Sequence, residues 1–274
     1  MHFNKDIFIT NSIKGFSGFE FDDFLSYALC LGGECKFIFN GMDFELHKGD
    51  LMVTRRSNLI EYIRPSKDFK VKNIMVKYSI IQLCSPQTNY GVRSHLSLFT
   101  NPVMKLNERQ VEICKKDFDW IEYRLSQTEH KFYNEILYNA IQSTILDFFD
   151  FHYELNEGSK VTQPLGSVMS RFLAMLENKE FRKYREVSYY ADVLCVTPKY
   201  LSEISKKVSG YGAHYWIKRY TLSDLSYLLR DKTLSFVEIA DMFNFSSLAY
   251  FSRYIQNNLG LSPSQVREGA SSAR

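Results

Sequence analysis

The last third of the chain carries apolar residues at three- and four-residue steps, the spacing of one helix face. Over residues 236–267 this pattern gives a short helix, a break and a second helix. Ser235 opens a capping-box sequence before the first helix. Asn244 stands at the break, and asparagine tolerates the left-handed backbone of a sharp turn. With Ser246 or Ser247 as the cap of the second helix, the stretch predicts a helix-turn-helix.

The same arrangement is repeated about fifty residues upstream, over 188–209. Ser188 is the predicted cap of the first helix, Cys195 lies in the turn, and Thr197 caps the second helix. Pro198 would occupy the first position of that helix, where the missing N–H costs nothing. A repeated motif is far more specific than a single copy.

Apolar positions over 213–229 predict one long helix between the two motifs. A rigid spacer of this kind would hold the second helices of the motifs about 34 Å apart, one turn of DNA. A supporting helix over 168–178 is expected before the first motif.

Residues 1 to about 100 follow a different pattern, with short alternating stretches separated by turns. Several short strands at this spacing suggest a small β-barrel or sandwich. The expected strands are 34–39, 44–47, 51–53, 59–63, 71–78 and 80–83.

The helical period returns over 107–155, in two segments separated by a polar break. Two helices joined by a short loop form an antiparallel hairpin, assigned to 106–155. One helix could simply cover the barrel, so a second apolar face favours a homodimer contact. That face consists of Tyr133, Leu137, Tyr138 and Phe149.

The predicted fold is therefore α+β with two domains. Residues 1–157 form a sensing and dimerisation domain, with a barrel at about 1–100 followed by the hairpin. The polar segment 158–167, which contains Gly and Pro, is the expected linker. Residues 168–274 form an all-α domain with both helix-turn-helix motifs. At 274 residues the chain is long enough for two hydrophobic cores.

Charge is distributed unevenly between these domains. The whole chain carries a net charge of +3. From residue 164 onward there are fifteen Lys and Arg against ten Asp and Glu, whereas residues 1–163 hold nineteen against twenty-one. The basic excess coincides with the tandem motifs and favours a polyanionic partner there. A solvated basic face is the simpler alternative.

Cysteine usage and hydropathy indicate a cytoplasmic protein. The five cysteines are odd in number and form no C-x-x-C pair, which suits free thiols in a reducing compartment. We find no signal-peptide pattern and no stretch long enough to cross a bilayer, so no membrane association is expected.

Candidate catalytic chemistry is sparse. Metal-dependent barrel enzymes bring several histidines together with a carboxylate. Here His2, His47 and His95 are widely spaced, and neither a phosphate-cradling Gly-rich loop nor a G-x-S-x-G elbow occurs. We therefore expect no catalytic residue, no metal and no cofactor. Aromatic residues are abundant in the barrel segment, and they either fill its core or line an apolar cavity for a small effector. They include Phe16, Phe19, Phe21, Phe24, Phe37 and Phe44.

The two motifs resemble the DNA-binding domain of the AraC/XylS family of bacterial transcription regulators. In the second motif the resemblance is carried by Ile239, Ala240, Asn244, Phe245, Tyr250, Phe251, Ser252, Arg253, Gly260, Leu261, Ser262, Pro263 and Arg267. In the first it is carried by Ala191, Thr197, Pro198, Lys199, Tyr200, Leu201, Ser202, Lys206, Lys207 and Gly210. The sequence departs from the family pattern at Cys195, Thr221, Leu225, Asn244, Ile255 and Gln256.

The resemblance implies a sequence-specific regulator, acting as an activator, that binds double-stranded DNA as a homodimer and contacts RNA polymerase. Around Leu46 to Leu51 the sequence is similar to the cupin-like sensor barrel often joined to this domain, which implies a small-molecule effector. Matched to the family pattern, the DNA-contacting positions are Thr197, Lys199, Ser202, Glu203, Lys206, Ser247, Leu248, Ala249, Ser252 and Arg253.

Two other functions compete with this interpretation. A cupin-type enzyme with an appended DNA-binding domain would contain bound metal. A regulator controlled only by a protein partner would bind no small molecule.

Overall fold

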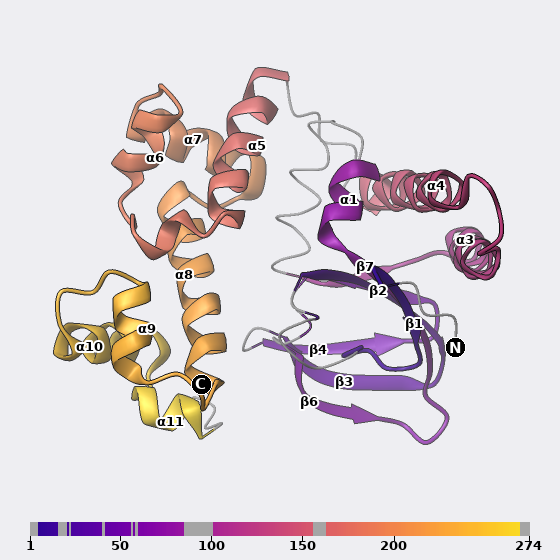
Figure 1. Ribbon diagram of the computed structural model, residues 1–274, viewed down its shortest axis with the longest axis horizontal. Coiled ribbons are helices and arrows are strands. Elements are labelled where there is room, and N and C mark those ends of the chain that lie inside the picture. Colours follow the sequence, from indigo (N-terminus) through magenta and orange to yellow (C-terminus); the bar gives the residue numbers. More distant parts are fainter. Residues whose placement is uncertain are drawn as a thin grey trace. The chain divides into compact units, whose positions relative to one another are not determined.

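The chain folds into two compact units, residues 1–160 and 161–274 (Figure 1). The computed structural model describes residues 5–15, 21, 23–39, 42–55, 57, 60–84, 101–155 and 163–268. Several residues named above lie outside these ranges. They are His2, Phe16, Phe19, His95 and the linker residues 158–162.

The first unit contains strands from two antiparallel sheets, followed by helices. The strands are β1 (Ile7–Thr10), β2 (Phe24–Gly32), β3 (Glu34–Phe39), β4 (Met42–His47), β5 (Asp50–Thr54), β6 (Ile60–Pro65), β7 (Lys70–Lys77) and β8 (Val103–Lys105). The helices are α1 (Tyr78–Cys84), α3 (Glu108–Ser126) and α4 (Tyr133–Leu155). One sheet has the strand order β1-β7-β2-β5-β8, and the other has the order β4-β3-β6.

Side chains alternate between the two faces of the five-stranded sheet. Tyr27 and Leu29 of β2 pack in one core with residues of α3 and α4. Ala28 and Cys30 pack in a second core with the smaller sheet. This period of two gives three layers, with the helical hairpin on one face of the larger sheet and the smaller sheet on the other (Figure 1).

The expected cupin-like barrel is not confirmed. The described strands pair as two separate sheets, and no pairing among them closes a barrel. The alternation that suggested a barrel occurs in any sheet whose two faces are buried to different extents. It therefore predicts strands and sheets, but it does not predict whether a sheet closes into a barrel.

Three strands were not predicted, and one predicted strand is wrong. β2 is buried along most of its length and so lacks a polar–apolar alternation. β1 and β8 are short. The segment 80–83 lies in helix α1 rather than in a strand. Three apolar residues within four fit a helix as well as a strand, because so short a segment shows no clear period.

The predicted helical hairpin is confirmed, but its second apolar face is not free. α3 begins with a capping box between Asn107 and Gln110. Leu137 is fully buried, and the other three residues of the expected face pack against the core of the same unit. That face therefore gives no support for a homodimer contact. The rings that the hairpin exposes include Trp120 and Tyr123, which stack with centroids 5.4 Å apart.

A half-buried carboxylate lies in this hairpin. Burial, and secondly the charge of Asp147, raise the pKa of Asp117 from 3.8 to about 7. Its Oδ2 atom has no hydrogen-bond partner among the described residues. Arg124 stacks over Trp120 and donates a hydrogen bond to Gln127 at 2.7 Å. Asp117 and Arg124 both line a groove of about 200 Å³ between α3 and α4.

Helices are the regular secondary structure of the described residues of the second unit. Its elements are α5 (Gln163–Glu177), the short 3-10 helix η3 (Glu180–Arg182), α6 (Val187–Val193), α7 (Pro198–Ser209), α8 (Ala213–Arg230), α9 (Phe236–Met242), α10 (Leu248–Leu259) and α11 (Pro263–Arg267). The expected helix over 168–178 begins earlier, so residues 163–167 belong to α5 rather than to a linker. Pro164 is compatible with this because proline is tolerated in the first turn.

The long helix α8 is the centre of this unit. Its Trp216, Tyr220 and Leu225 are fully buried. It contacts α6 and α7, which precede it in the chain, and α9, α10 and α11, which follow it. The predicted spacer helix is therefore confirmed, and both helix-turn-helix motifs pack against it.

Candidate nucleic-acid interface

The turns of the two motifs have the same geometry. In the first, Cys195 is left-handed with φ 58°, and the N–H of Val196 donates to the carbonyl of Ala191 at 2.9 Å. In the second, Asn244 is left-handed with φ 51°, and the N–H of Phe245 donates to the carbonyl of Ala240 at 3.0 Å. The internal repeat predicted from the sequence is thus a repeat of structure.

The second helix of each motif is capped as expected. The Thr197 hydroxyl accepts a hydrogen bond from the N–H of Tyr200 at 3.2 Å, and Pro198 lies in the first turn of α7. The Ser247 hydroxyl accepts one from the N–H of Tyr250 at 3.1 Å. Of the two candidate serines, Ser247 is therefore the cap of α10.

The first helices of the motifs begin differently from each other. Ser235 and Glu238 form the predicted capping box at the start of α9. Ser188 is not the cap of α6, because the helix begins at Val187 and Glu186 takes the cap position without a side-chain hydrogen bond. The serine at 188 lies one residue inside the helix, where the capping preference no longer applies.

All ten predicted DNA-contacting residues lie on the outer faces of α7 and α10 or at their caps. Thr197, Lys199, Glu203 and Lys206 are exposed, and Ser202 is half-buried. In α10 the exposed set is Ser247, Leu248, Ala249 and Arg253, again with a half-buried serine, Ser252. The opposite faces are buried through Leu201, Ile204, Val208, Phe251 and Ile255. Each helix is therefore held by its apolar face and presents its first turns outward.

The two outer faces differ chemically. In α7, Lys199 and Glu203 form an exposed pair with Nζ and Oε1 3.9 Å apart. In α10, the matching face offers the apolar Leu248 and Ala249 together with Arg253. The first helix can thus exchange hydrogen bonds with base edges, whereas the second offers apolar contact and one cation.

Sequence reasoning missed one pair of residues on this surface. Tyr200 and Tyr250 occupy the third helical position after the cap in α7 and α10, and they are 43% and 50% exposed. Exposed phenol rings at equivalent places in the two motifs can contact sugar or phosphate. Each tyrosine follows its cap residue by three positions in the sequence, and this shared spacing was the signal that could have identified them.

The two motifs are tied together by arginines as well as by α8. Arg185, which precedes α6, donates a hydrogen bond to the carbonyl of Phe243 and stacks over Phe245 in the second motif. Arg182 forms a partly buried ion pair with Asp224 of α8, with Nε and Oδ2 2.7 Å apart, and stacks over Phe243 of the second motif. These contacts hold the segment that leads into α6 against α8 and against the turn of the second motif.

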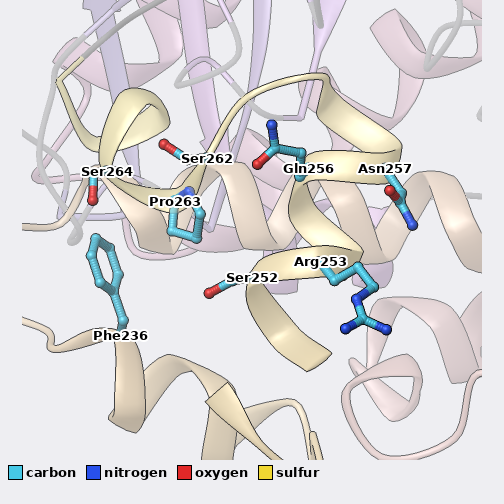
Figure 2. Close-up of a pocket in the computed structure, with 8 residues that line it drawn as sticks. All are labelled: Phe236, Ser252, Arg253, Gln256, Asn257, Ser262, Pro263 and Ser264. Atoms are coloured by element: carbon cyan, nitrogen blue, oxygen red, sulfur yellow. The ribbon is translucent and has the colours of Figure 1, made fainter. Parts of the chain in front are cut away.

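An open cleft of about 450 Å³ lies beside α10 (Figure 2). One wall is formed by the outer face of α10, including Ser252 and Arg253. The cleft is lined by Phe236, Ser252, Arg253, Gln256, Asn257, Ser262, Pro263 and Ser264. It is therefore continuous with the second candidate recognition surface.

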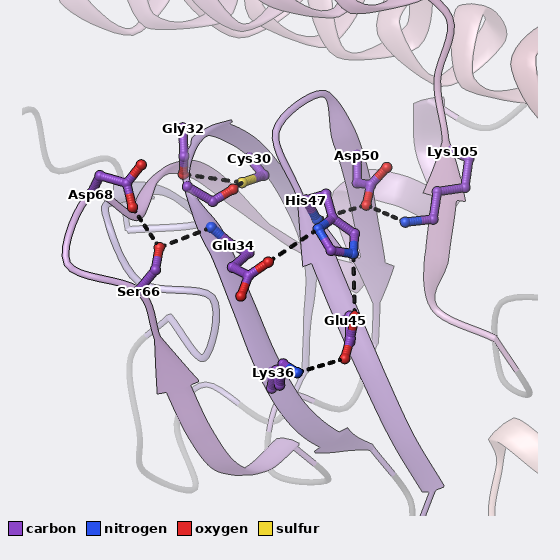
Figure 3. Close-up of polar contacts among 11 residues, drawn as sticks. Cys30, Gly32, Glu34, Lys36, Glu45, His47, Asp50, Ser66, Asp68 and Lys105 are labelled. Atoms are coloured by element: carbon purple, nitrogen blue, oxygen red, sulfur yellow. Dashed lines mark hydrogen bonds and ion pairs between the residues drawn. The ribbon is translucent and has the colours of Figure 1, made fainter.

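The described polar side chains of the first unit form small ion-pair groups. His47 lies between two carboxylates, with Nδ1 3.6 Å from Glu34 and Nε2 3.4 Å from Glu45 (Figure 3). Its backbone N–H donates to Asp50 at 2.7 Å. Within the described ranges, no group of three or more His, Cys, Asp or Glu is arranged to hold a metal ion. All five cysteines are free, and four of them are buried.

Comparison with known proteins locates one family domain in the chain. Residues 190–269 match the family model of a helix-turn-helix domain. No curated protein sequence matches the chain significantly. None of the helices described is long and apolar enough to span a membrane.

Solved structures give distant matches over most of the chain. ToxT from Vibrio cholerae is 13% identical, with 96% of this chain and 94% of that chain covered and a TM-score of 0.47. The unsaturated-fatty-acid-bound form of ToxT is 11% identical, with 96% and 95% covered and a TM-score of 0.47. The AraC-like transcriptional activator CuxR is 10% identical, with 74% and 67% covered and a TM-score of 0.32.

Proposed function

We propose that this chain, a transcription regulator of the AraC family by its C-terminal helix-turn-helix domain, recognises its DNA sites by laying α7 and α10 into successive major grooves. The observation that carries the proposal is the repeated geometry of the two motifs, each with a capped helix whose first turns face outward. The basic excess of the C-terminal segment supports the same partner, because phosphates attract such a surface.

Within this proposal the residues have distinct roles. Lys199, Ser202 and Glu203 contact base edges in the first half of the site. Thr197 and Lys206, and in the second motif Ser247 and Ser252, contact the backbone. Arg253 reaches a guanine or a phosphate, and Leu248 and Ala249 contact thymine methyl groups.

The test is genome-wide mapping of the sites bound by the full chain, followed by binding to duplexes that carry those sites. The expected result is a shared sequence whose two parts are one helical turn apart. A double variant, Lys199→Glu with Arg253→Glu, should bind none of these duplexes at the same protein concentration. Bound regions without any common sequence would contradict the proposal.

We further propose that the regulator acts as a homodimer through the outer face of its hairpin. Trp120 and Tyr123 support this because they are exposed large rings on neighbouring turns of α3. A dimer would bring two DNA-binding domains to one site and make the second contact intramolecular.

The effector that the protein senses and its effect on transcription are also proposals. We infer that the first unit receives a small-molecule effector in the cytoplasm and that the DNA-bound protein activates transcription through RNA polymerase. The resemblance of the motifs to the AraC/XylS family supports both. A screen of small molecules by thermal shift of the full chain tests the effector, and a failure to find any stabilising compound favours control by a protein partner.

A further inference from the structure

The groove between α3 and α4 is lined by two residues whose polar atoms the fold leaves unsatisfied. Asp117 Oδ2 and Arg124 Nε are buried, and each lacks a hydrogen-bond partner among the described residues. Within the part of the chain that the structure describes, no other buried side-chain nitrogen or oxygen of a residue that is itself buried or half-buried is in this state. Both residues line the same groove of about 200 Å³. Buried polar atoms without partners are costly, so an acid and a base of this kind in one groove indicate a ligand with matching groups.

Asp117 forms the acidic end of the groove. Burial and the charge of Asp147 raise its pKa to about 7, whereas a neighbouring cation would lower it. The groove also contains Asn139 and Ser143, which are exposed on α4 and add an amide and a hydroxyl for hydrogen bonding. The terminal torsion of an aspartate is broad, so either oxygen can turn towards a ligand at small cost. This end of the groove therefore suits an ammonium group.

Arg124 forms the basic end. Its guanidinium has five N–H donors, of which one is donated to Gln127 at 2.7 Å. The guanidinium lies over the ring of Trp120, 4.1 Å from the centroid. Trp120 follows Asp117 by three residues, which is about 5 Å along the helix axis. The two charged ends are thus about one helical turn apart. A second positive charge on a ligand would be repelled here, whereas a carboxylate would be bound.

The wall between the two ends is apolar, because Ile136 and Ala140 of α4 lie there. The volume of about 200 Å³ is several times the ~30 Å³ of one water molecule, so a small organic molecule fits. We propose that this groove binds a small zwitterionic amino acid, with its ammonium group on Asp117 and its carboxylate on Arg124. This inference rests on the proposed effector-binding role of the first unit and adds a site and a ligand class to it. Trp120 also belongs to the proposed dimer face, so the ligand would lie beside that face.

The first experiment compares ligands that carry both charged groups with ligands that carry one. 4-Aminobutyrate, butylamine, butyrate and glycine are each titrated calorimetrically into the full chain, up to about 10 mM because so few atoms limit the affinity. The titrations are made at about pH 8, where Asp117 is mostly ionised. We expect 4-aminobutyrate to bind at least about tenfold more tightly than each single-ended analogue, which leaves one buried charge unpaired. Glycine should bind weakly, because its two charged groups are too close together to reach both ends.

Butylamine or butyrate binding as tightly as 4-aminobutyrate would overturn the proposal, because one end of the groove would then contribute nothing. Absence of binding by 4-aminobutyrate would also overturn it, and the groove would then be a site for water alone.

The second experiment assigns each end of the ligand to its residue. Asp117→Asn should weaken 4-aminobutyrate binding by at least about tenfold and leave butyrate binding unchanged. Arg124→Gln should weaken 4-aminobutyrate binding to a similar extent and leave butylamine binding unchanged. A variant that merely misfolds would weaken every ligand alike, so this crossed pattern separates a binding role from a structural one.

The matched controls remove the same charges at exposed positions. They are Asp43→Asn on β4 and Lys131→Gln just before α4. Each should change the affinity for 4-aminobutyrate by less than about threefold, since it acts only through the net charge of the protein. Losses in the controls as large as those in the groove variants would overturn the proposal.

Failure of this inference differs from failure of the proposed function. If 4-aminobutyrate does not bind but another compound in the thermal-shift screen stabilises the protein, the amino-acid site is wrong and the effector proposal stands. If no compound of any class stabilises the protein, the effector proposal itself fails as well.

Discussion

Lys199 and Glu203 lie one turn apart on the outer face of α7, with Nζ 3.9 Å from Oε1. Both side chains are largely exposed, at 87% and 62%, so water screens their attraction and the pair contributes little to folding. The pair can therefore open at small cost when DNA arrives, which frees a donor and an acceptor for base edges.

The first prediction concerns the specificity that this pair provides. Lys199→Ala and Glu203→Ala should each relax the preference at particular base pairs in one half of the site, by about 1–3 kcal/mol of discrimination. The thermal stability of the protein should stay unchanged. The measurement is binding to every single-base variant of the mapped site, with Lys207→Ala as a control that weakens all sequences alike.

The second prediction concerns the role of α10. Arg253→Ala should lower affinity evenly across sequences and reduce the salt slope by about one if the guanidinium holds a phosphate. Salt titrations of wild type and variant on one duplex measure this directly. Suppose that Ala249 variants change the base preference while the α7 variants leave it unchanged. Then α10 would be the main source of sequence specificity, and the roles assigned to the two helices would be reversed.

The capped helices of the second unit could be predicted from the sequence because their signals are local. Thr197, Ser235 and Ser247 each act on a backbone N–H only a few residues away, so no distant contact is needed to identify them. The left-handed residue at each turn was likewise visible from its place between two apolar stripes.

The missed features depend on contacts between distant segments. Whether the strands close into a barrel depends on which of them pair, and the pairing of β2 with both β5 and β7 joins segments far apart in the chain. Leu137 appeared to belong to a free face because the sequence does not show what covers it. The cleft beside α10 was missed for the same reason, since its walls are formed by three separate elements.

The third prediction uses the strained turn of the first motif. Cys195 has φ 58°, a conformation that costs a residue with a Cβ roughly 1 kcal/mol. Cys195→Gly should therefore raise the free energy of unfolding of the second unit by up to about 1 kcal/mol, partly offset by the greater freedom of glycine in the unfolded chain. Urea titration measures it. Cys195→Ala keeps the Cβ and should be neutral, so equal gains in both variants would exclude strain as the cause.

The fourth prediction concerns pH and the hairpin. The folded pKa of Asp117 is raised to about 7 from 3.8, so the folded protein holds a proton there that the unfolded chain has released. The stabilisation from this proton is complete below about pH 4 and is lost as pH rises towards 7. The stability of the first unit should thus fall between these values.

Asp117→Asn removes the titrating group and should flatten this pH dependence. The variant should be more stable than the wild type at and above pH 7, because the amide carries no charge to bury. Urea midpoints recorded across the range give the comparison, with Asp43→Asn as an exposed control on β4. A wild-type slope that survives in Asp117→Asn would assign the effect to another group.

The fifth prediction tests the proposed dimer face. Trp120→Asp should raise the dissociation constant of the dimer by at least about tenfold, because large aromatic residues dominate the energetics of interfaces. Analytical ultracentrifugation measures it. Leu83→Asp, at a 72% exposed leucine on α1, is the matched control and should leave the dimer intact. A wild-type protein that is monomeric at all concentrations would rule out this part of the proposal.

The contacts of Arg185 with the second motif affect how the bound DNA must bend. Because Arg185 joins the segment before α6 to the turn after α9, the two motifs are connected at a second place besides α8 and have little freedom to hinge about that helix. The distance and angle between the recognition helices are then properties of the free protein. Any mismatch with the pitch of straight B-form DNA has to be taken up by the duplex, at a cost of order 1–6 kcal/mol for a substantial bend. Base steps that no side chain touches would then influence affinity through their flexibility.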